Sequence, residues 1–127
     1  MSRILAIDYG EKRMGLALSD EEQKFAFEFE IWSPEQIFED LPNLIKEKDV
    51  SKIVLGNPLN MSGEATKKTE EVMEFKKKLE ALCGLEIELA DERLSSKMAE
   101  NISGHHKNID SLAAQIFLQN YLNKQTN

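Results

Sequence analysis

The chain has 127 residues, of which 41% are hydrophobic and 31% are charged. This composition is typical of a globular protein with a buried core, so an intrinsically disordered chain is not expected. The formal net charge of −7 disfavours a protein that holds nucleic acid only by its own Lys and Arg side chains. The charge counts less against a metal-dependent nuclease, because divalent cations cover the carboxylates at such a site.

Length and the lack of certain segments set the expected domain number and location. A chain of this length is expected to form a single domain over residues 1–127. No apolar stretch reaches membrane-spanning length, and the first residues lack the pattern of a signal peptide. Cys83, the single cysteine, cannot form an intrachain disulfide and is expected to fill core space near a helix end. We therefore expect a cytoplasmic protein.

The chain opens with three predicted strands. Residues 4–7 are a short apolar run, residues 14–18 form a second strand after a charged turn, and residues 25–31 alternate between apolar and polar side chains. The short connections between them indicate an antiparallel arrangement.

Asp8 directly follows the first of these strands. A carboxylate at the edge of a core costs free energy unless a partner compensates its charge. That partner is a metal ion, a Lys or Arg side chain, or backbone N–H groups. Alternatively, Asp8 only opens a turn before Gly10. The local pattern leaves both interpretations open.

A helix is predicted after the third strand. Ser33 is its expected N-cap, Pro34 takes the first helical position, and Gln36 completes a capping box. Pro42 interrupts the apolar face of this helix, so it should kink the helix or split it in two.

The next segments alternate between strand and helix. Residues 53–55 form a compact apolar strand, and the turn-rich residues 56–63 follow it. Residues 64–82 carry apolar side chains at helical spacing. Residues 85–89 alternate as a half-exposed strand, which favours a position near the edge of the sheet.

The end of the chain is predicted to be helical. A short helix begins at Ser95 or Ser96 and ends at Ile102, and residues 104–108 form a polar loop. Residues 109–122 form the last helix, whose inward-facing side chains are expected to be Leu112, Ala113, Ile116, Phe117 and Tyr121.

The order of these elements predicts an α/β fold with a mixed sheet. Strand–helix–strand units make parallel neighbours, so the first strand is expected in the centre, beside the strand at residues 53–55. Sites in such sheets gather at the carboxyl ends of the parallel strands. Asp8, residues 56–63 and the pair Asp91-Glu92 all follow strand ends. We expect them to converge on one edge, and Asp110 joins them if the last helix begins there.

Four blocks of the sequence together resemble one known family. They are AIDYGEKRMGLALSD at residues 6–20, IVLGNPLNMSGE at residues 53–64, DERLSS at residues 91–96 and NIDSLAAQIFLQNYL at residues 108–122. In their order and spacing they resemble the YqgF family of proteins similar to Holliday junction resolvases, regarded as nucleases of pre-16S ribosomal RNA. The resemblance covers nearly the whole chain.

The resemblance implies a ribonuclease-H-like fold, a mixed five-stranded sheet flanked by helices. It also implies a cytoplasmic hydrolase of phosphodiester bonds that depends on Mg²⁺ or Mn²⁺. Asp8, Glu92 and Asp110 would be its catalytic residues and metal ligands. Several carboxylates fit such chemistry, because two cations that activate a water and stabilise the leaving oxygen need several anionic oxygens.

Each of these carboxylates also has a structural interpretation. Asp110 can stabilise the start of a helix through the helix dipole. Glu92 can pair with Arg93 or with a lysine. Asp91 is either a further ligand or a turn former.

Four residues are expected to bind the substrate: Lys12, Arg13, Asn57 and Arg93. Arg can bind phosphate with two hydrogen bonds and Lys as a point charge. Alternatively, Lys12 and Arg13 neutralise Asp8 and Glu11, and Asn57 only shapes its turn.

The expected partner is structured RNA such as pre-rRNA, or junction DNA, with association to a ribosomal precursor and no membrane. The expected protein is a monomer or a homodimer. The alternatives to an rRNA nuclease are a Holliday junction DNA resolvase and a non-catalytic nucleic-acid-binding module of the same fold. A phosphate-binding ATPase of the actin and sugar-kinase type is disfavoured, because its two lobes need a longer chain.

Overall fold

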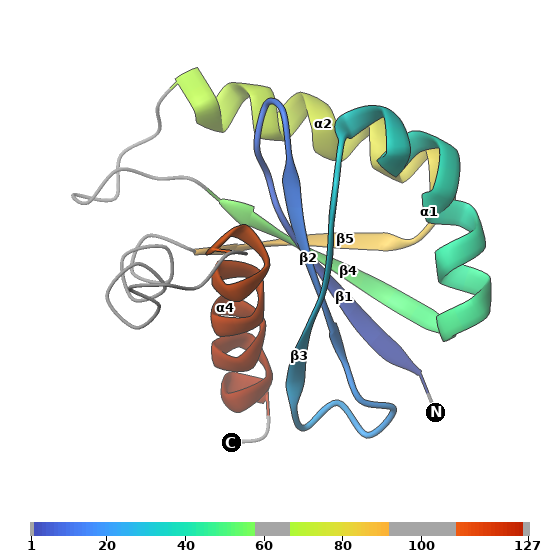
Figure 1. Ribbon diagram of the computed structural model, residues 1–127, viewed down its shortest axis with the longest axis vertical. Helices are drawn as coiled ribbons and strands as arrows, with labels where there is room; N and C mark the ends of the chain where they lie inside the picture. Colours follow the sequence, from blue (N-terminus) through green and yellow to red (C-terminus); the bar gives the residue numbers. More distant parts are fainter. Residues whose placement is uncertain (1, 58–66, 92–108, 126–127) are drawn as a thin grey trace.

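Within residues 2–57, 67–91 and 109–125, which the computed structural model describes, five strands form one mixed sheet in the order β3-β2-β1-β4-β5 (Figure 1). Its pairs are antiparallel between β1 and β2 and between β2 and β3, and parallel between β1 and β4 and between β4 and β5. In chain order the elements are β1 (Arg3–Asp8), β2 (Met14–Ser19), β3 (Ala26–Trp32), α1 (Pro34–Lys48), β4 (Val50–Asn57), α2 (Lys67–Cys83), β5 (Glu86–Asp91) and α4 (Ile109–Gln125).

This topology confirms the predicted arrangement of strands. β1 is central and pairs with β4, and β5 lies at one edge of the sheet. The predicted turn-rich segment beyond Asn57, the helix that would begin at Ser95 or Ser96 and the polar loop at residues 104–108 lie outside the described residues.

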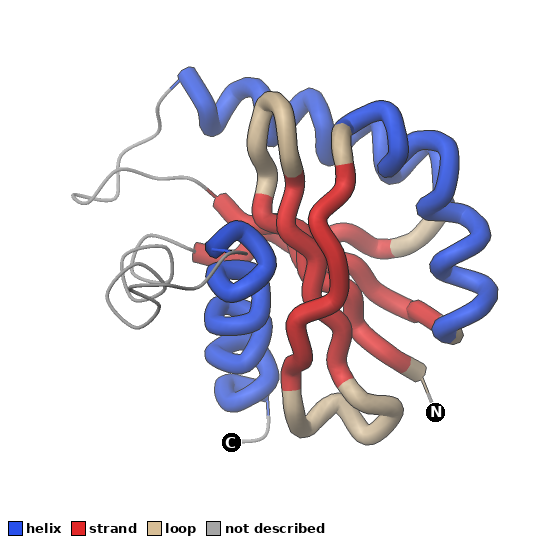
Figure 2. The backbone as a smooth tube through the Cα atoms, in the orientation of Figure 1, coloured by secondary structure: helices blue, strands red, loops and turns tan. Residues whose placement is uncertain are grey.

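Helices cover both faces of the sheet (Figure 2). α1 and α2 lie on one face, and α4 lies on the other. Side chains of β1 alternate between the two cores: Leu5 and Ile7 pack with α1 and α2, whereas Ile4 and Ala6 pack with α4. Because both faces are covered, residues 4–7 of the strand form an unbroken apolar run.

The cap of α1 is the one expected from the sequence. The Ser33 hydroxyl accepts a hydrogen bond from the Gln36 N–H at 3.1 Å, and Pro34 begins the helix. Pro42 does not split the helix, which continues to Lys48. Figure 1 shows the helix changing direction along its length, as expected where a proline leaves the Phe38 carbonyl without its helical donor.

The buried side chains of α4 extend over a wider part of its surface than the sequence predicted. Leu112, Ala113 and Phe117 are buried as expected, whereas Ile116 and Tyr121 are only partly buried. The prediction missed three buried side chains on the same helix: Ala114, Leu118 and Leu122. Within the part of the chain that the structure describes, neither α4 nor another helix has the length and apolarity to cross a membrane.

Cys83 ends α2 and is half-buried against the core shared with α1. Its thiol donates to the Leu79 carbonyl at 3.0 Å. Gly84 follows with φ +67 and donates its N–H to the Glu80 carbonyl, which ends the helix in the left-handed conformation that glycine adopts readily. The core-filling role predicted for Cys83 is therefore consistent with its position.

Aromatic side chains at the start of the edge strand β3 are exposed to solvent. Phe25 and Phe27 are 60% and 56% exposed, whereas Ala26 is buried. Two side chains of α4 hold the backbone of Ala26: Gln119 Oε1 accepts its N–H at 2.8 Å, and Gln115 Nε2 donates to its carbonyl at 3.1 Å. Gln119 Nε2 also donates to the Lys24 carbonyl. The two glutamines therefore fasten α4 along β3.

Asp20 organises the connection between β2 and β3. Its Oδ1 accepts the backbone N–H groups of Lys24 at 2.8 Å and of Phe25 at 3.1 Å. These two bonds, that of Phe25 first, lower the pKa of Asp20 below its usual value of 3.8.

We expect the Asp20 carboxylate to stabilise the fold only above the acid range. Because its pKa is lower in the folded chain, the contribution is complete above about pH 3.8 and is lost as the pH falls through the folded pKa. Asp20→Asn keeps an oxygen acceptor but cannot titrate, so its stability should vary less between pH 2 and 5 than that of the wild type. Urea unfolding over this range measures the difference, and identical pH profiles would contradict it.

Candidate active site

Three parallel strands end side by side at one edge of the sheet. Asp8 ends β1, Asn57 ends β4 and Asp91 ends β5. The pairing of Ile7 with Leu55 and of Asn57 with Asp91 keeps these ends level. Figure 1 shows that β4 and β5 end on the side of the molecule where α4 begins. The predicted convergence of strand ends is therefore present in the backbone.

Asp8 lies on the face of the sheet that α4 covers. It continues the alternation of Ile4 and Ala6, which pack against α4, and it is half-buried. The next residue, Tyr9, turns to the opposite face, where its ring lies 5.2 Å from that of Phe75. Burial, followed by the nearby Glu71, Glu11 and Glu74, raises the pKa of the Tyr9 hydroxyl. The side chains of Asp8 and Tyr9 thus lie on opposite faces of the sheet.

The first turn of α4 is anchored near the end of β1. The buried Ser111 hydroxyl donates to Glu28 Oε1 at 2.9 Å. In the sheet, Glu28 of β3 lies opposite Ala17 of β2, and Ala17 lies opposite Ala6 of β1. Ser111 is therefore bound at the level of Ala6, two residues before Asp8. Asp110 precedes Ser111 in the same turn. This anchor brings the backbone of Asp110 toward the strand ends, as the sequence predicted conditionally.

Glu92 and Arg93 lie outside the described residues, directly after the end of β5. The side chains of Asn57, Asp91 and Asp110 are also outside the description. Among the side chains that the structure does describe, no group of three or more His, Cys, Asp or Glu residues is arranged to hold a metal ion. The metal-binding roles of Asp8, Glu92 and Asp110 therefore stay predictions.

The turn between β1 and β2 depends on a glycine. A Cβ atom at Gly10 would lie 2.1 Å from the Arg13 carbonyl oxygen, so a larger residue would force the turn apart. Lys12 and Arg13 are exposed in this turn, a few residues beyond Asp8. The prediction that they lie at the opening of the first hairpin is confirmed, and their contact with substrate stays a prediction.

Besides the contacts of Gln115 and Gln119, two further polar contacts of α4 were not predicted from the sequence. One is the bond between Ser111 and Glu28. The other joins Tyr121 to β5 and β4: the Tyr121 hydroxyl donates to Glu88, and Lys52 Nζ lies 2.7 Å from Glu88 Oε2. The hydrogen bond from Lys52, and then that from Tyr121, lowers the pKa of Glu88. No local pattern marks such partners, because each pair is far apart in sequence.

The sequence matches known proteins over nearly its whole length. Residues 2–124 match the family RuvX, described as Holliday junction resolvase. The chain is 40% identical to a protein of Maridesulfovibrio salexigens named "Putative pre-16S rRNA nuclease", over 94% of this chain and 97% of the relative. It is 38% identical to a protein of the same name from Natranaerobius thermophilus, over 98% of this chain and 96% of the relative.

Two solved structures share the fold. RuvC of T. thermophilus in complex with a Holliday junction substrate matches with a TM-score of 0.61 at 11% identity, over 99% of this chain and 96% of that one. The resolvase of fowlpox virus with Holliday junction DNA matches with a TM-score of 0.59 at 11% identity, over 98% and 99% of the two chains. These likenesses confirm the predicted ribonuclease-H-like architecture. On the match of its sequence, the chain belongs to the RuvX family, which confirms the predicted YqgF membership.

Proposed function

We propose that this chain is a metal-dependent nuclease that hydrolyses phosphodiester bonds in the maturation of pre-16S ribosomal RNA. The observation that carries the proposal is the half-buried Asp8 at the end of the central strand, level with the ends of β4 and β5 and near the first turn of α4. The names of the relatives from two bacteria support this substrate. Such a nuclease is expected in the cytoplasm.

In this proposal Asp8, Glu92 and Asp110 hold Mg²⁺ or Mn²⁺. Their carboxylate oxygens are the donors that these hard cations prefer, and their positions follow two strand ends and a helix start. Bound cations would supply an activated water and charge stabilisation at the leaving oxygen.

The substrate phosphates need separate cationic and polar groups in this proposal. Lys12 and Arg13 lie exposed in the turn just beyond Asp8, where their side chains can reach a phosphate bound at the edge of the sheet. Asn57, at the end of β4, and Arg93, after Glu92, complete the proposed substrate-binding set. A strand of nucleic acid would then cross the carboxyl edge between the first hairpin and the start of α4.

The decisive experiment incubates the purified protein with a structured fragment of pre-16S rRNA and with a four-way DNA junction. Each is incubated with Mg²⁺, Mn²⁺ or EDTA. We expect cleavage of the RNA with either cation and no cleavage in EDTA, with activity restored when excess cation is added back. Full activity in the chelator would contradict metal dependence.

The same experiment separates the alternatives. Cleavage confined to the DNA junction would favour a Holliday junction resolvase, the description given to the matched family. Binding of both nucleic acids without cleavage under every condition would favour a non-catalytic module and would overturn the nuclease proposal.

A further inference from the structure

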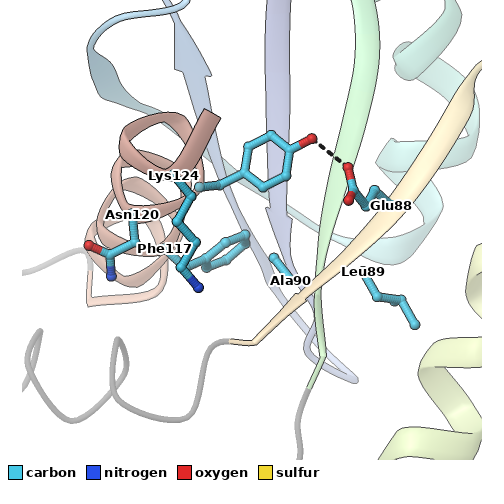
Figure 3. Close-up of a pocket in the computed structure, with 7 residues that line it drawn as sticks. Glu88, Leu89, Ala90, Phe117, Asn120 and Lys124 are labelled. Atoms are coloured by element: carbon cyan, nitrogen blue, oxygen red, sulfur yellow. Dashed lines mark hydrogen bonds between the residues drawn. The ribbon is translucent and has the colours of Figure 1, made fainter. Parts of the chain in front are cut away.

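A groove lies between α4 and the edge strand β5 (Figure 3). Its volume of about 340 Å³ is near the lower end of the range for small-molecule sites, about 300–1,000 Å³. Its walls come from the end of β5 and the second half of α4. The lining residues are Glu88, Leu89, Ala90, Phe117, Asn120, Tyr121 and Lys124.

The groove begins beside the candidate active site and leads away from it. Ala90 directly precedes Asp91, the last residue of β5, and pairs with Gly56 of β4. On α4, Phe117 and Lys124 lie about 10 Å and about 21 Å along the helix axis from Asp110, at 1.5 Å per residue. A strand of nucleic acid that crosses the carboxyl edge can therefore continue into the groove.

Among the described residues that line the groove, Glu88 is the acidic one, and its negative charge is compensated. Glu88 Oε2 lies 2.7 Å from Lys52 Nζ and accepts a hydrogen bond from the Tyr121 hydroxyl. Lys52 Nζ also lies 5.3 Å from the centroid of the Tyr121 ring, which holds that ring in place. Lys124 is exposed and makes no ion pair with the described part of the chain. With Lys52 beside the groove and Lys124 in its lining, two lysines thus stand against the Glu88 carboxylate, on a protein of net charge −7.

The chemistry of the groove fits a nucleotide. Ala90 and the ring of Tyr121, both half-buried, supply an apolar wall, and Figure 3 shows Asn120 and Lys124 on α4. A base presents flat apolar faces that pack on such a wall, and its phosphate is a strong acceptor for an ammonium group. We propose that this groove binds one nucleotide of the substrate strand away from the cleaved bond, with a phosphate on Lys124. The proposal rests on the nuclease function proposed above and extends it.

The first test measures binding without cleavage. Fluorescence anisotropy in EDTA gives the Kd of a labelled structured RNA and of a labelled four-way DNA junction. Lys124→Glu should weaken binding about 3- to 10-fold and reduce the salt dependence by about one released counterion. Lys46→Glu is the matched control, because Lys46 is exposed on α1, across the sheet from α4. Thermal melts of both variants check that the fold is intact.

The second test locates the contact along the substrate. On the nucleic acid that the wild type cleaves, Lys124→Glu should raise KM with little change in kcat, because Lys124 is far from the cleaved bond. On a substrate cut back to the nucleotides next to that bond, the two proteins should behave alike. Equal effects of Lys124→Glu and Lys46→Glu, or an undiminished effect on the short substrate, would overturn the groove assignment.

The outcomes for the groove and for the nuclease are distinguishable. If the wild type cleaves nothing but Lys124→Glu selectively weakens binding, the nuclease proposal fails, and the groove stands as a nucleotide-binding site without a role in cleavage. If the wild type cleaves and Lys124→Glu matches its control, the nuclease proposal stands and the groove fails. If the wild type binds neither nucleic acid, the groove assignment is wrong.

Discussion

Asp8→Asn is expected to lower the rate of phosphodiester cleavage by at least about 100-fold. Loss of a group that only supports a metal ligand typically costs 10- to 100-fold, and Asp8 is proposed as a ligand itself. Asparagine has nearly the same shape, so the end of β1 and its pairing with Gly15 should persist. Without metal, thermal stability should be equal or higher, because like charges gathered at one site repel. Cleavage assays and thermal melts of the purified variant measure both effects.

Asp49→Asn is the matched control for this variant. It removes the same charge at the opposite end of the parallel strands, where Asp49 precedes β4 with φ 52, a conformation that asparagine tolerates well. We expect its cleavage rate to equal that of the wild type. If Asp8→Asn unfolds the protein while Asp49→Asn does not, Asp8 is a structural turn residue and its catalytic assignment is wrong.

Phe117→Ala is expected to lower the free energy of unfolding by about 3–5 kcal/mol. Phe117 is 1% exposed and belongs to the core between α4 and the sheet, with Ile4, Ala6 and Val54 among its members. Truncation would remove the transfer free energy of the ring and leave a cavity in the layer that α4 covers. Urea unfolding measures the loss.

Phe25→Ala is the control for this second variant. Phe25 is 60% exposed at the start of the edge strand, so its truncation should change the free energy of unfolding by no more than about 0.5 kcal/mol. Similar losses for the two variants would mean that α4 does not dock on the sheet through Phe117.

The sequence predicted the elements better than it predicted which faces they bury. Period-2 alternation correctly marked β3 as a strand, yet Phe25 and Phe27 are exposed there and Ala26 is buried. The reason is tertiary: α4 packs over Ala26 and binds its backbone through Gln119, 93 residues away in the chain. Alternation shows that two faces exist, but the partner helix decides which one is covered.

Part of the candidate site was also predictable. Strand ends follow from local apolar runs, so the positions of Asp8, Asn57 and Asp91 at one edge could be predicted once β1 was taken as central. The anchor of α4 through Ser111 and Glu28 could not, because their contact joins residues 83 apart with no shared pattern. The groove beside β5 was missed for the same reason, since its walls meet only in the folded chain.

The two glutamines that fasten α4 to β3 have a consequence for the behaviour of the protein in solution. An uncovered strand edge is a template on which a second chain can add, and exposed aromatic side chains such as Phe25 and Phe27 favour such an encounter. Gln115 and Gln119 occupy the donor and acceptor of Ala26 and so close the start of that edge. We therefore expect the helix that carries Asp110 to limit self-association through this strand edge as well. Tight packing of α4 against the sheet would therefore favour both solubility and catalysis. We expect a substitution that weakens this packing to cause aggregation before it lowers activity.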